Sequence, residues 1–136
     1  GYSRAMRYGF AAGDHYEAAN RATACHLMIE TPGALRDVAA ICALPTVDGV
    51  FIGPADLSLT RGRGPFRFGP GDEEDFRAVA AAARAAGKAL GLPAPGAGAF
   101  AFAAAAGADY VTIADDLSAM KQGFEAAMAA ARTRLA

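Results

Sequence analysis

The chain has 136 residues, 54% of them hydrophobic, and a formal net charge of −1 at pH 7. This length fits one domain or part of one, and the balanced charge favours neither nucleic acid nor an anionic membrane as a partner. No uninterrupted apolar stretch reaches the roughly 18 residues that cross a bilayer, so we expect no membrane association. Cys25 and Cys42 lie in apolar runs, which favours buried free thiols in a reducing cytoplasm over a disulfide.

The predicted elements begin with a helix over 14–22, for which Asp14 is the N-cap. Thr31 and Pro32 suit the N-cap and first turn of a second helix, and Gly87 suits the end of a third. The apolar stripe of the second helix comprises Leu35, Val38, Ala39 and Cys42. Apolar runs predict four strands, over 24–30, 50–53, 88–92 and 110–114. Further helices are expected over 73–86, 99–106 and 117–134, the last capped by Asp116, with a long loop over 58–71.

The predicted order is one helix followed by four βα units, and this alternation implies a parallel sheet with right-handed crossovers. The strand ends recur at intervals close to the ~31 residues expected when ~250 residues form eight such units. We therefore predict an α/β chain that forms half of a (β/α)8 barrel, with residues 1–136 as a single partial domain. An independent four-stranded domain would leave strands that are apolar on both faces uncovered on one of them.

Two of the predicted strands each have a single carboxylate at the carboxyl end of their apolar run, Glu30 in one case and Asp56 in the other. The carboxyl ends of parallel strands are where α/β folds place their chemistry. Each acid alone has a structural explanation, since Glu30 suits the first turn of the next helix and Asp56 suits a turn after Gly-Pro. Together they predict a Mg²⁺ or Mn²⁺ site with open positions for a 2-oxo acid.

The backbone from Gly53 to Asp56 offers a second kind of contact. Gly53 lets main chain approach a ligand closely, and the amides of Ala55 and Asp56 are free to donate to a carboxylate or enolate oxygen. A tight turn needs Gly and Pro for the same steric reasons, so a purely structural role stays open.

The remaining polar residues receive structural explanations. Because strand side chains alternate, His26, Met28 and Glu30 share one face, which we expect to line the barrel. His26 then lies two layers below Glu30 as a core histidine whose hydrogen bonds are made, and His15 is expected to face solvent. Three arginines over 61–67 are residues of the type that contacts a phosphate or coenzyme A. No helix N-terminus directly follows them, however, which favours a solvated or interface loop.

At Ile29-Glu30-Thr31 and from Val47 to Ser58 the sequence closely resembles the HpcH/HpaI aldolase/citrate lyase family, above all its metal-dependent 2-oxo acid aldolases. The Gly-Pro-Ala-Asp-Leu-Ser stretch is specific to that group, and the similarity runs from Arg4 to the last helix. The resemblance implies a (β/α)8 barrel of which this chain is the C-terminal half. It also implies reversible cleavage of a 4-hydroxy-2-oxo acid to pyruvate and an aldehyde.

By the same resemblance, Glu30 and Asp56 match the family's ligands for Mg²⁺, Mn²⁺ or Co²⁺. The main chain at Ala55 and Asp56 matches the region that receives the substrate carboxylate. Met28 stands where family aldolases often carry a glutamine that contacts the pyruvate unit, and a thioether cannot make that amide's hydrogen bonds. No position matches the family's catalytic histidine or substrate-binding arginine. Both are expected upstream of Gly1, so the chain by itself is predicted to be inactive.

The family is typically hexameric, with its terminal helix packed on a neighbour. The apolar stripe of the last helix here suits such packing, although a helix packed on its own chain would show the same stripe. The stripe comprises Met120, Phe124, Ala127, Met128 and Ala131.

Two other functions stay open. The protein could be a citrate-lyase-like carbon–carbon lyase that uses a coenzyme A thioester, with the arginine loop contacting the coenzyme. It could also be an inactive half-barrel that serves as a binding or oligomerisation module, because half a barrel exposes strand edges that favour association.

Overall fold

The computed structural model describes residues 12–135, which form a single parallel sheet in the order β1-β2-β3-β4 with helices between the strands. The elements in chain order are α1 (Ala12–Ala22), β1 (His26–Ile29), α2 (Pro32–Arg36), α3 (Val38–Cys42), β2 (Gly49–Ile52), α4 (Pro54–Thr60), α5 (Pro70–Ala85), β3 (Ala89–Pro93), α6 (Ala97–Ala106), β4 (Tyr110–Thr112) and α7 (Asp116–Leu135). The predicted parallel sheet of four βα units is confirmed. Arg4, where the family resemblance begins, lies outside the described residues.

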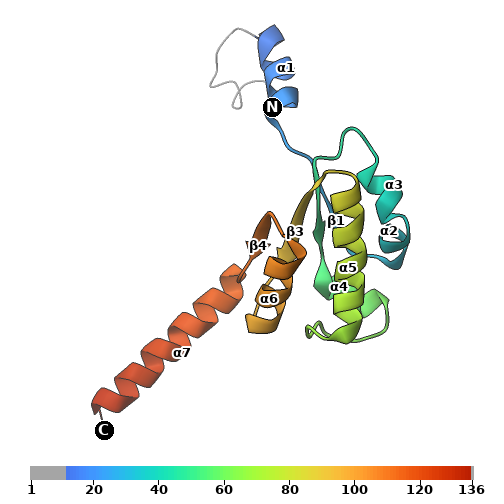
Figure 1. The fold of residues 1–136 in the computed structure, drawn as a ribbon. Helices are drawn as coiled ribbons and strands as arrows, with labels where there is room; N and C mark the ends of the chain where they lie inside the picture. Colours follow the sequence, from blue (N-terminus) through green and yellow to red (C-terminus); the bar gives the residue numbers. More distant parts are fainter. Residues whose placement is uncertain (1–11, 136) are drawn as a thin grey trace.

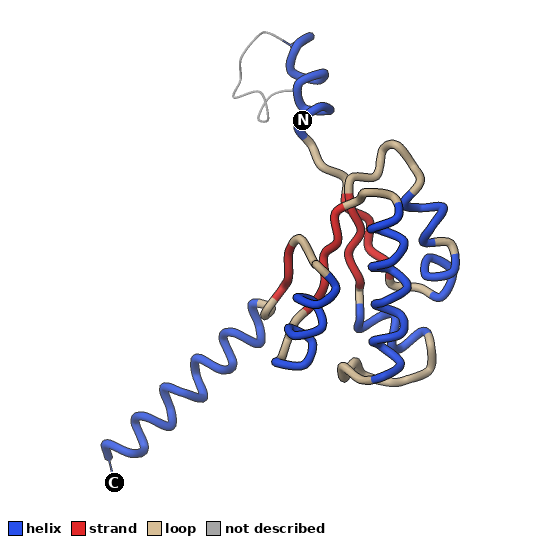
Figure 2. The backbone as a smooth tube through the Cα atoms, viewed as in Figure 1, coloured by secondary structure: helices blue, strands red, loops and turns tan. Residues whose placement is uncertain are grey.

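One face of the sheet is covered by helices and the other is open (Figures 1 and 2). The covered face carries fully buried Ile29, Ile52 and Leu92, against which Phe76 and Val79 of α5 pack. Phe76 in turn contacts the rings of three further phenylalanines, at centroid separations of 5.6 to 6.3 Å. Burial of this cluster is the main source of stability, because each large apolar side chain removed from water contributes roughly 1.5–3 kcal/mol.

The strand register places the open-face side chains in layers. Met28 is level with Phe51, Phe51 with Gly91, and Gly91 with Tyr110. Since side chains two residues apart share a face, Glu30 and Gly53 belong to the next layer toward the carboxyl ends of the strands. The same alternation that directs Ile29 toward α5 therefore presents Met28 and Glu30 on the open face.

Several local predictions are confirmed. The Thr31 hydroxyl accepts a hydrogen bond from the Ala34 amide at 3.1 Å, which makes it the N-cap of α2. Gly87 and Gly107 follow α5 and α6 with φ angles of 63° and 71°, a left-handed conformation that glycine adopts without a steric penalty.

Other helix boundaries differ from the prediction. Helix α1 begins at Ala12, so Asp14 lies inside it, and the single helix expected after Thr31 is divided at Asp37 into α2 and α3. Ala39 is consequently exposed rather than part of the buried stripe. The chain is helical from Pro54 to Thr60, so the expected loop over 58–71 is shorter.

The N-cap of the last helix also differs from the prediction. The N-cap of α7 is Asp115 and not Asp116, because Asp115 Oδ1 accepts from the Ser118 amide at 2.8 Å. Hydrogen bonds from the Ser118 amide and hydroxyl hold the pKa of the Asp115 carboxyl below its ordinary value.

Cys25 is exposed, so only Cys42 fulfils the prediction of a buried thiol. His15 is half-buried, with its ring edge against Tyr16, rather than fully in solvent.

Helix α7 runs away from the sheet (Figures 1 and 2). Met120, Phe124 and Met128 are each more than half exposed. Packing of the helix on the described residues, 12–135, therefore does not explain the stripe. In residues 12–135, no helix combines the length and hydrophobicity that crossing a bilayer requires.

Candidate functional site at the carboxyl ends of the strands

Glu30 lies directly over Gly53 at the carboxyl ends of β1 and β2. The Gly53 amide donates to the carbonyl oxygen of Ile29 at 3.1 Å, which extends the strand pairing by one residue. A Cβ atom added to Gly53 would lie 2.7 Å from Glu30 Cβ and 2.9 Å from both Glu30 Oε2 and Met28 Sδ. The sequence therefore needs glycine here for close approach, since its φ of −91° is open to any residue. Met28 and Glu30 share a face, as predicted.

Asp56 lies in the first turn of α4, three residues beyond Gly53. Pro54 opens this helix, where its missing N–H costs nothing because that position has no intrahelical partner. The amides of Ala55 and Asp56 also belong to the first turn and lack intrahelical acceptors. The turn predicted at this position is thus the start of a helix, with an acid and two free donors beside the end of β2.

The residues present suit a hard divalent cation. Glu30 is half-buried and Asp56 is exposed, and the two follow adjacent parallel strands at the same end of the sheet. Within residues 12–135, no set of three or more His, Cys, Asp and Glu side chains gathers as a ready metal site. Two carboxylates fit a cation such as Mg²⁺, which keeps several waters and binds proteins through one or two carboxylates plus substrate.

An apolar hollow of about 370 Å³ adjoins Pro54 on the same end of the molecule. Phe51 and Pro93 form part of its wall, and the Asp115 carboxylate lies among its lining residues. The remaining lining residues are Pro54, Phe66, Pro95, Thr112, Ile113 and Ala114. This hollow supplies an apolar surface next to the acidic end of β1 and β2.

A hydrogen bond crosses the open face below Glu30 and joins Tyr110, one layer below it, to His26, two layers below it. His26 Nδ1 lies 2.8 Å from Tyr110 Oη, although the two residues come from the two edge strands. Gly49 and Gly91 make the crossing possible, because a Cβ at either position would collide with one of the two rings. His26 is therefore hydrogen-bonded, as predicted, but it is exposed rather than buried in a core. Burial raises the pKa of the Tyr110 hydroxyl.

Sequence reasoning missed Tyr110, whose role depends on a contact 84 residues away. The available signal was a glycine in each of two adjacent apolar strands, Gly49 and Gly91, two residues apart in register and therefore on the same face, which indicates that a large side chain lies across them.

The loop that carries Arg61, Arg63 and Arg67 is exposed, as predicted, but two of its arginines are also held in ion pairs. Arg61 Nε lies 3.2 Å and Arg63 Nη2 lies 2.6 Å from the same oxygen of Asp75, a carboxylate that is 2% exposed. These two arginines are therefore occupied within the chain.

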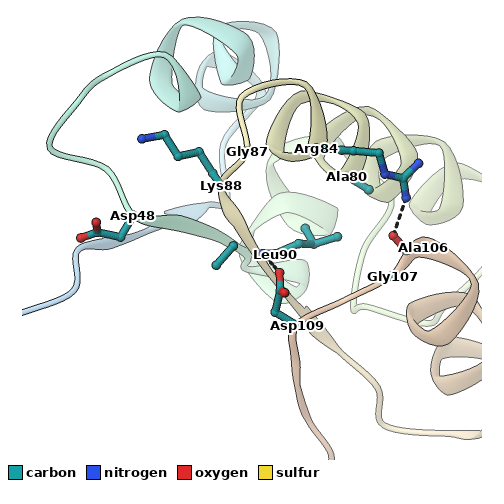
Figure 3. Close-up of a pocket in the computed structure, with 10 residues that line it drawn as sticks. Asp48, Ala80, Arg84, Gly87, Lys88, Leu90, Ala106, Gly107 and Asp109 are labelled. Atoms are coloured by element: carbon teal, nitrogen blue, oxygen red, sulfur yellow. Dashed lines mark hydrogen bonds between the residues drawn. The ribbon is translucent and has the colours of Figure 1, made fainter.

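A second hollow, of about 530 Å³, lies at the amino-terminal end of β3 (Figure 3). Three of its polar side chains have structural partners: Asp48 accepts from the Cys25 amide at 2.7 Å, Asp109 from the Leu90 amide at 2.8 Å, and Arg84 donates to the Ala106 carbonyl at 2.7 Å. Because this end of a parallel barrel serves stability rather than catalysis, we place no chemistry there.

Comparison with known proteins identifies the group to which this arrangement belongs. A family model described as HpcH/HpaI aldolase/citrate lyase matches residues 3–121. The chain belongs to the HpcH/HpaI aldolase/citrate lyase family. Its resemblance to this family, drawn from Glu30, Asp56 and their neighbours, is thereby confirmed.

Two known aldolases are similar to part of this chain. A 2-dehydro-3,6-dideoxy-6-sulfogluconate aldolase from Pseudomonas putida is 46% identical over 59 residues, which cover 43% of this chain and 23% of that protein. A hydroxypyruvate/pyruvate aldolase from Sagittula stellata is 44% identical over 62 residues, 46% of this chain and 24% of that protein.

A crystal structure of an HpcH/HpaI family protein from Burkholderia cenocepacia superposes with a TM-score of 0.85 at 30% identity. The match covers 97% of this chain and 51% of that chain. The HpcH/HpaI chain described here therefore spans about half the length of that solved structure, and its α/β fold is a partial barrel.

Proposed function

We propose that this chain forms the metal-holding half of a divalent-metal-dependent aldolase. The reaction is the reversible cleavage of a 4-hydroxy-2-oxo acid to pyruvate and an aldehyde. The observation that carries the proposal is the Glu30 carboxylate lying over Gly53, beside the turn of α4 that contains Asp56. Family membership and the aldolase names of similar proteins support it.

Each residue of the site has one task in this proposal. Glu30 and Asp56 hold Mg²⁺, Mn²⁺ or Co²⁺, and the amides of Ala55 and Asp56 donate to the substrate carboxylate. Met28 lies against the pyruvate unit and supplies contact without hydrogen bonds. When bound, the metal supplies Lewis acidity for the negative charge that develops on the 2-oxo oxygen.

The proton-transferring base and the arginine that anchors the carboxylate belong, in this proposal, to a part of the protein outside the present chain. No catalytic base is therefore assigned among residues 12–135. The single domain is a partial one, and the chain by itself is inactive.

The test separates metal binding from chemistry. Glu30→Gln keeps the size of the side chain and removes its charge, so the Mn²⁺ dissociation constant measured by electron paramagnetic resonance should rise at least 100-fold. In the complete enzyme, exchange of the pyruvate methyl protons with deuterated water, followed by NMR, should cease. Glu74→Gln, the same chemical change on an exposed site of α5, is the matched control. Unchanged Mn²⁺ affinity or unchanged exchange in Glu30→Gln would refute the proposal.

The arginine loop does not support the alternative of a lyase that uses a coenzyme A thioester. Arg61 and Arg63 already pair with Asp75, so a coenzyme phosphate would have to displace a buried carboxylate. Calorimetric titration with coenzyme A should give no heat of binding under conditions where pyruvate and Mn²⁺ bind.

We further propose that the exposed stripe on α7 packs on a neighbouring subunit of a homo-oligomer, of the hexameric kind that family resemblance implies. The support is the exposure of Met120, Phe124 and Met128. Replacing Phe124 and Met128 by serine should lower the mass measured by sedimentation equilibrium, whereas the oligomer would persist if another surface formed the interface.

A further inference from the structure

Two buried aspartates of α5 form the centre of a charged cluster that the proposed reaction does not use. Asp72 is 6% exposed and Asp75 is 2% exposed. Asp75 Oδ2 lies 2.6 Å from Arg63 Nη2 and 3.2 Å from Arg61 Nε, while Asp72 Oδ1 lies 3.1 Å from Arg63 Nη2. Arg63 Nη1 also donates to the Gly71 carbonyl at 3.3 Å. Buried charges of this kind persist only when they are paired, so this cluster fixes the positions of both arginines.

The loop that carries these arginines is also bonded to α4. The Ser58 hydroxyl donates to the Gly64 carbonyl at 2.9 Å, and the Arg63 amide donates to the Ser58 carbonyl at 2.9 Å. Gly62 and Gly64 adopt φ angles of 73° and 77°, which bends the chain back toward the helix that it leaves. The loop that carries the arginines is therefore bonded directly to α4.

Helix α4 has only seven residues, from Pro54 to Thr60, and Arg61 is its C-cap. A helix this short has no stability of its own in water, so tertiary contacts must hold it in place. Leu57 anchors one side in the core, and the arginine cluster anchors the C-terminal end. Asp56 lies one turn away from that end, in the first turn of the same helix.

We propose that Asp75 is a positioning residue for the cation site: by holding Arg61 and Arg63 it fixes α4, and with it the Asp56 carboxylate and the neighbouring amides. The proposal rests on the function given above, because it assumes that Asp56 binds the cation. Without the Asp75 carboxylate, two guanidinium groups next to one another lose their shared counter-charge. Arg63 keeps its pair with Asp72, but Arg61 moves toward solvent, and the loop and the end of α4 move with it.

The test compares Asp75→Asn with Glu74→Gln, the same chemical change at the adjacent, exposed position of α5. The probe is Mn²⁺ alone, titrated into the whole protein by electron paramagnetic resonance well below the melting temperature, with circular dichroism to confirm the fold. Asp75→Asn should raise the Mn²⁺ dissociation constant at least tenfold. It should also speed hydrogen exchange of the amides of residues 57–60, whereas Glu74→Gln should change neither.

A second variant keeps the proposal falsifiable if Asp75→Asn fails to fold. Arg61→Gln removes one of the two guanidinium groups that pair with Asp75 and leaves Arg63 bound to it. The Arg61 side chain is 37% exposed, so glutamine can be accommodated there. It should weaken Mn²⁺ binding about threefold. An unchanged Mn²⁺ affinity in folded Asp75→Asn, or in Arg61→Gln when Asp75→Asn does not fold, would overturn the positioning role, even if the melting temperature fell.

The outcomes also separate this inference from the proposed function. If Glu30→Gln binds Mn²⁺ like the unmodified protein, the proposed cation site is wrong, and the hydrogen exchange of α4 alone then tests the anchoring by Asp75. If Glu30→Gln abolishes binding and folded Asp75→Asn leaves it unchanged, only the positioning role fails.

Discussion

The contact between Glu30 and Gly53 allows one substitution to test stability and cation binding together. In Gly53→Ala, the new Cβ would lie 2.7 Å from Glu30 Cβ, and the carboxylate oxygen and Met28 Sδ would each lie 2.9 Å away. Carbon atoms in proteins pack best at roughly 3.5–4.0 Å, so Glu30 Cβ has to move by about 1 Å. Because Cβ is fixed to the backbone of the residue that follows β1, the end of the strand moves with it.

The magnitude follows from this displacement. Overpacking of this kind costs roughly 1–3 kcal/mol. An unfolding entropy of about 2.1 cal/mol/K per residue, applied to a chain of 136 residues, converts each kcal/mol into about 3.5 °C of melting temperature. We therefore expect Gly53→Ala to melt about 4–10 °C lower. Metal–oxygen bonds at ~2.0–2.6 Å do not tolerate such a shift, so Mn²⁺ affinity should fall at least tenfold.

Differential scanning calorimetry and Mn²⁺ titration measure the two effects, with Gly123→Ala as the control. Gly123 lies in α7 with no atom near enough to meet an added Cβ, and alanine should raise helix stability by up to about 1 kcal/mol. If Gly53→Ala kept both the melting temperature and the Mn²⁺ affinity of the unmodified protein, Glu30 would not lie over Gly53 in solution.

Three other properties can be checked independently. Gly91→Ala places a Cβ against the ring of Tyr110 and should lower the free energy of unfolding in urea by roughly 1–3 kcal/mol, whereas an unchanged midpoint would mean that the ring lies elsewhere. The pKa of Asp115 is lowered by hydrogen bonds to its carboxylate. Its stabilisation of α7 should therefore be complete above the ordinary Asp pKa of about 3.9 and fall as pH drops through the lower folded value. Circular dichroism at 222 nm should show this loss of helix, and Asp115→Asn should remove its pH dependence. Because burial raises the pKa of the Cys42 thiol, Ellman's reagent should react quickly with Cys25 alone and with both thiols only in denaturant.

Local chemistry explains the features that sequence reasoning predicted correctly. Thr31 before Pro32, and Gly87 after an alanine-rich helix, act through bonds within four residues of themselves. The alternation of apolar strands and helices likewise reports which backbone pattern can bury its side chains. Glu30 and Asp56 were candidates because the carboxyl ends of parallel strands meet at one edge.

The wrong predictions involve competition between near neighbours or contacts across the fold. Asp115 and Asp116 are adjacent and both suit an N-cap, and in the structure Asp115 is the one that accepts the hydrogen bonds from Ser118. Cys25 lies in an apolar run and is nevertheless exposed. Arg61 and Arg63 are exposed, as predicted, but their ion pairs were missed because the partner, Asp75, lies in the next helix.

By itself, the sequence determined a parallel sheet of four βα units, its family and the two acids that end adjacent strands, because these depend on short-range patterns of residue type. Only the tertiary structure decided that Glu30 lies over Gly53, that a histidine and a tyrosine meet across two glycines, and that α5 holds the arginine loop. These contacts join residues that are far apart along the chain, and their energies depend on burial and close packing, which exist only once the sheet and its helices have assembled.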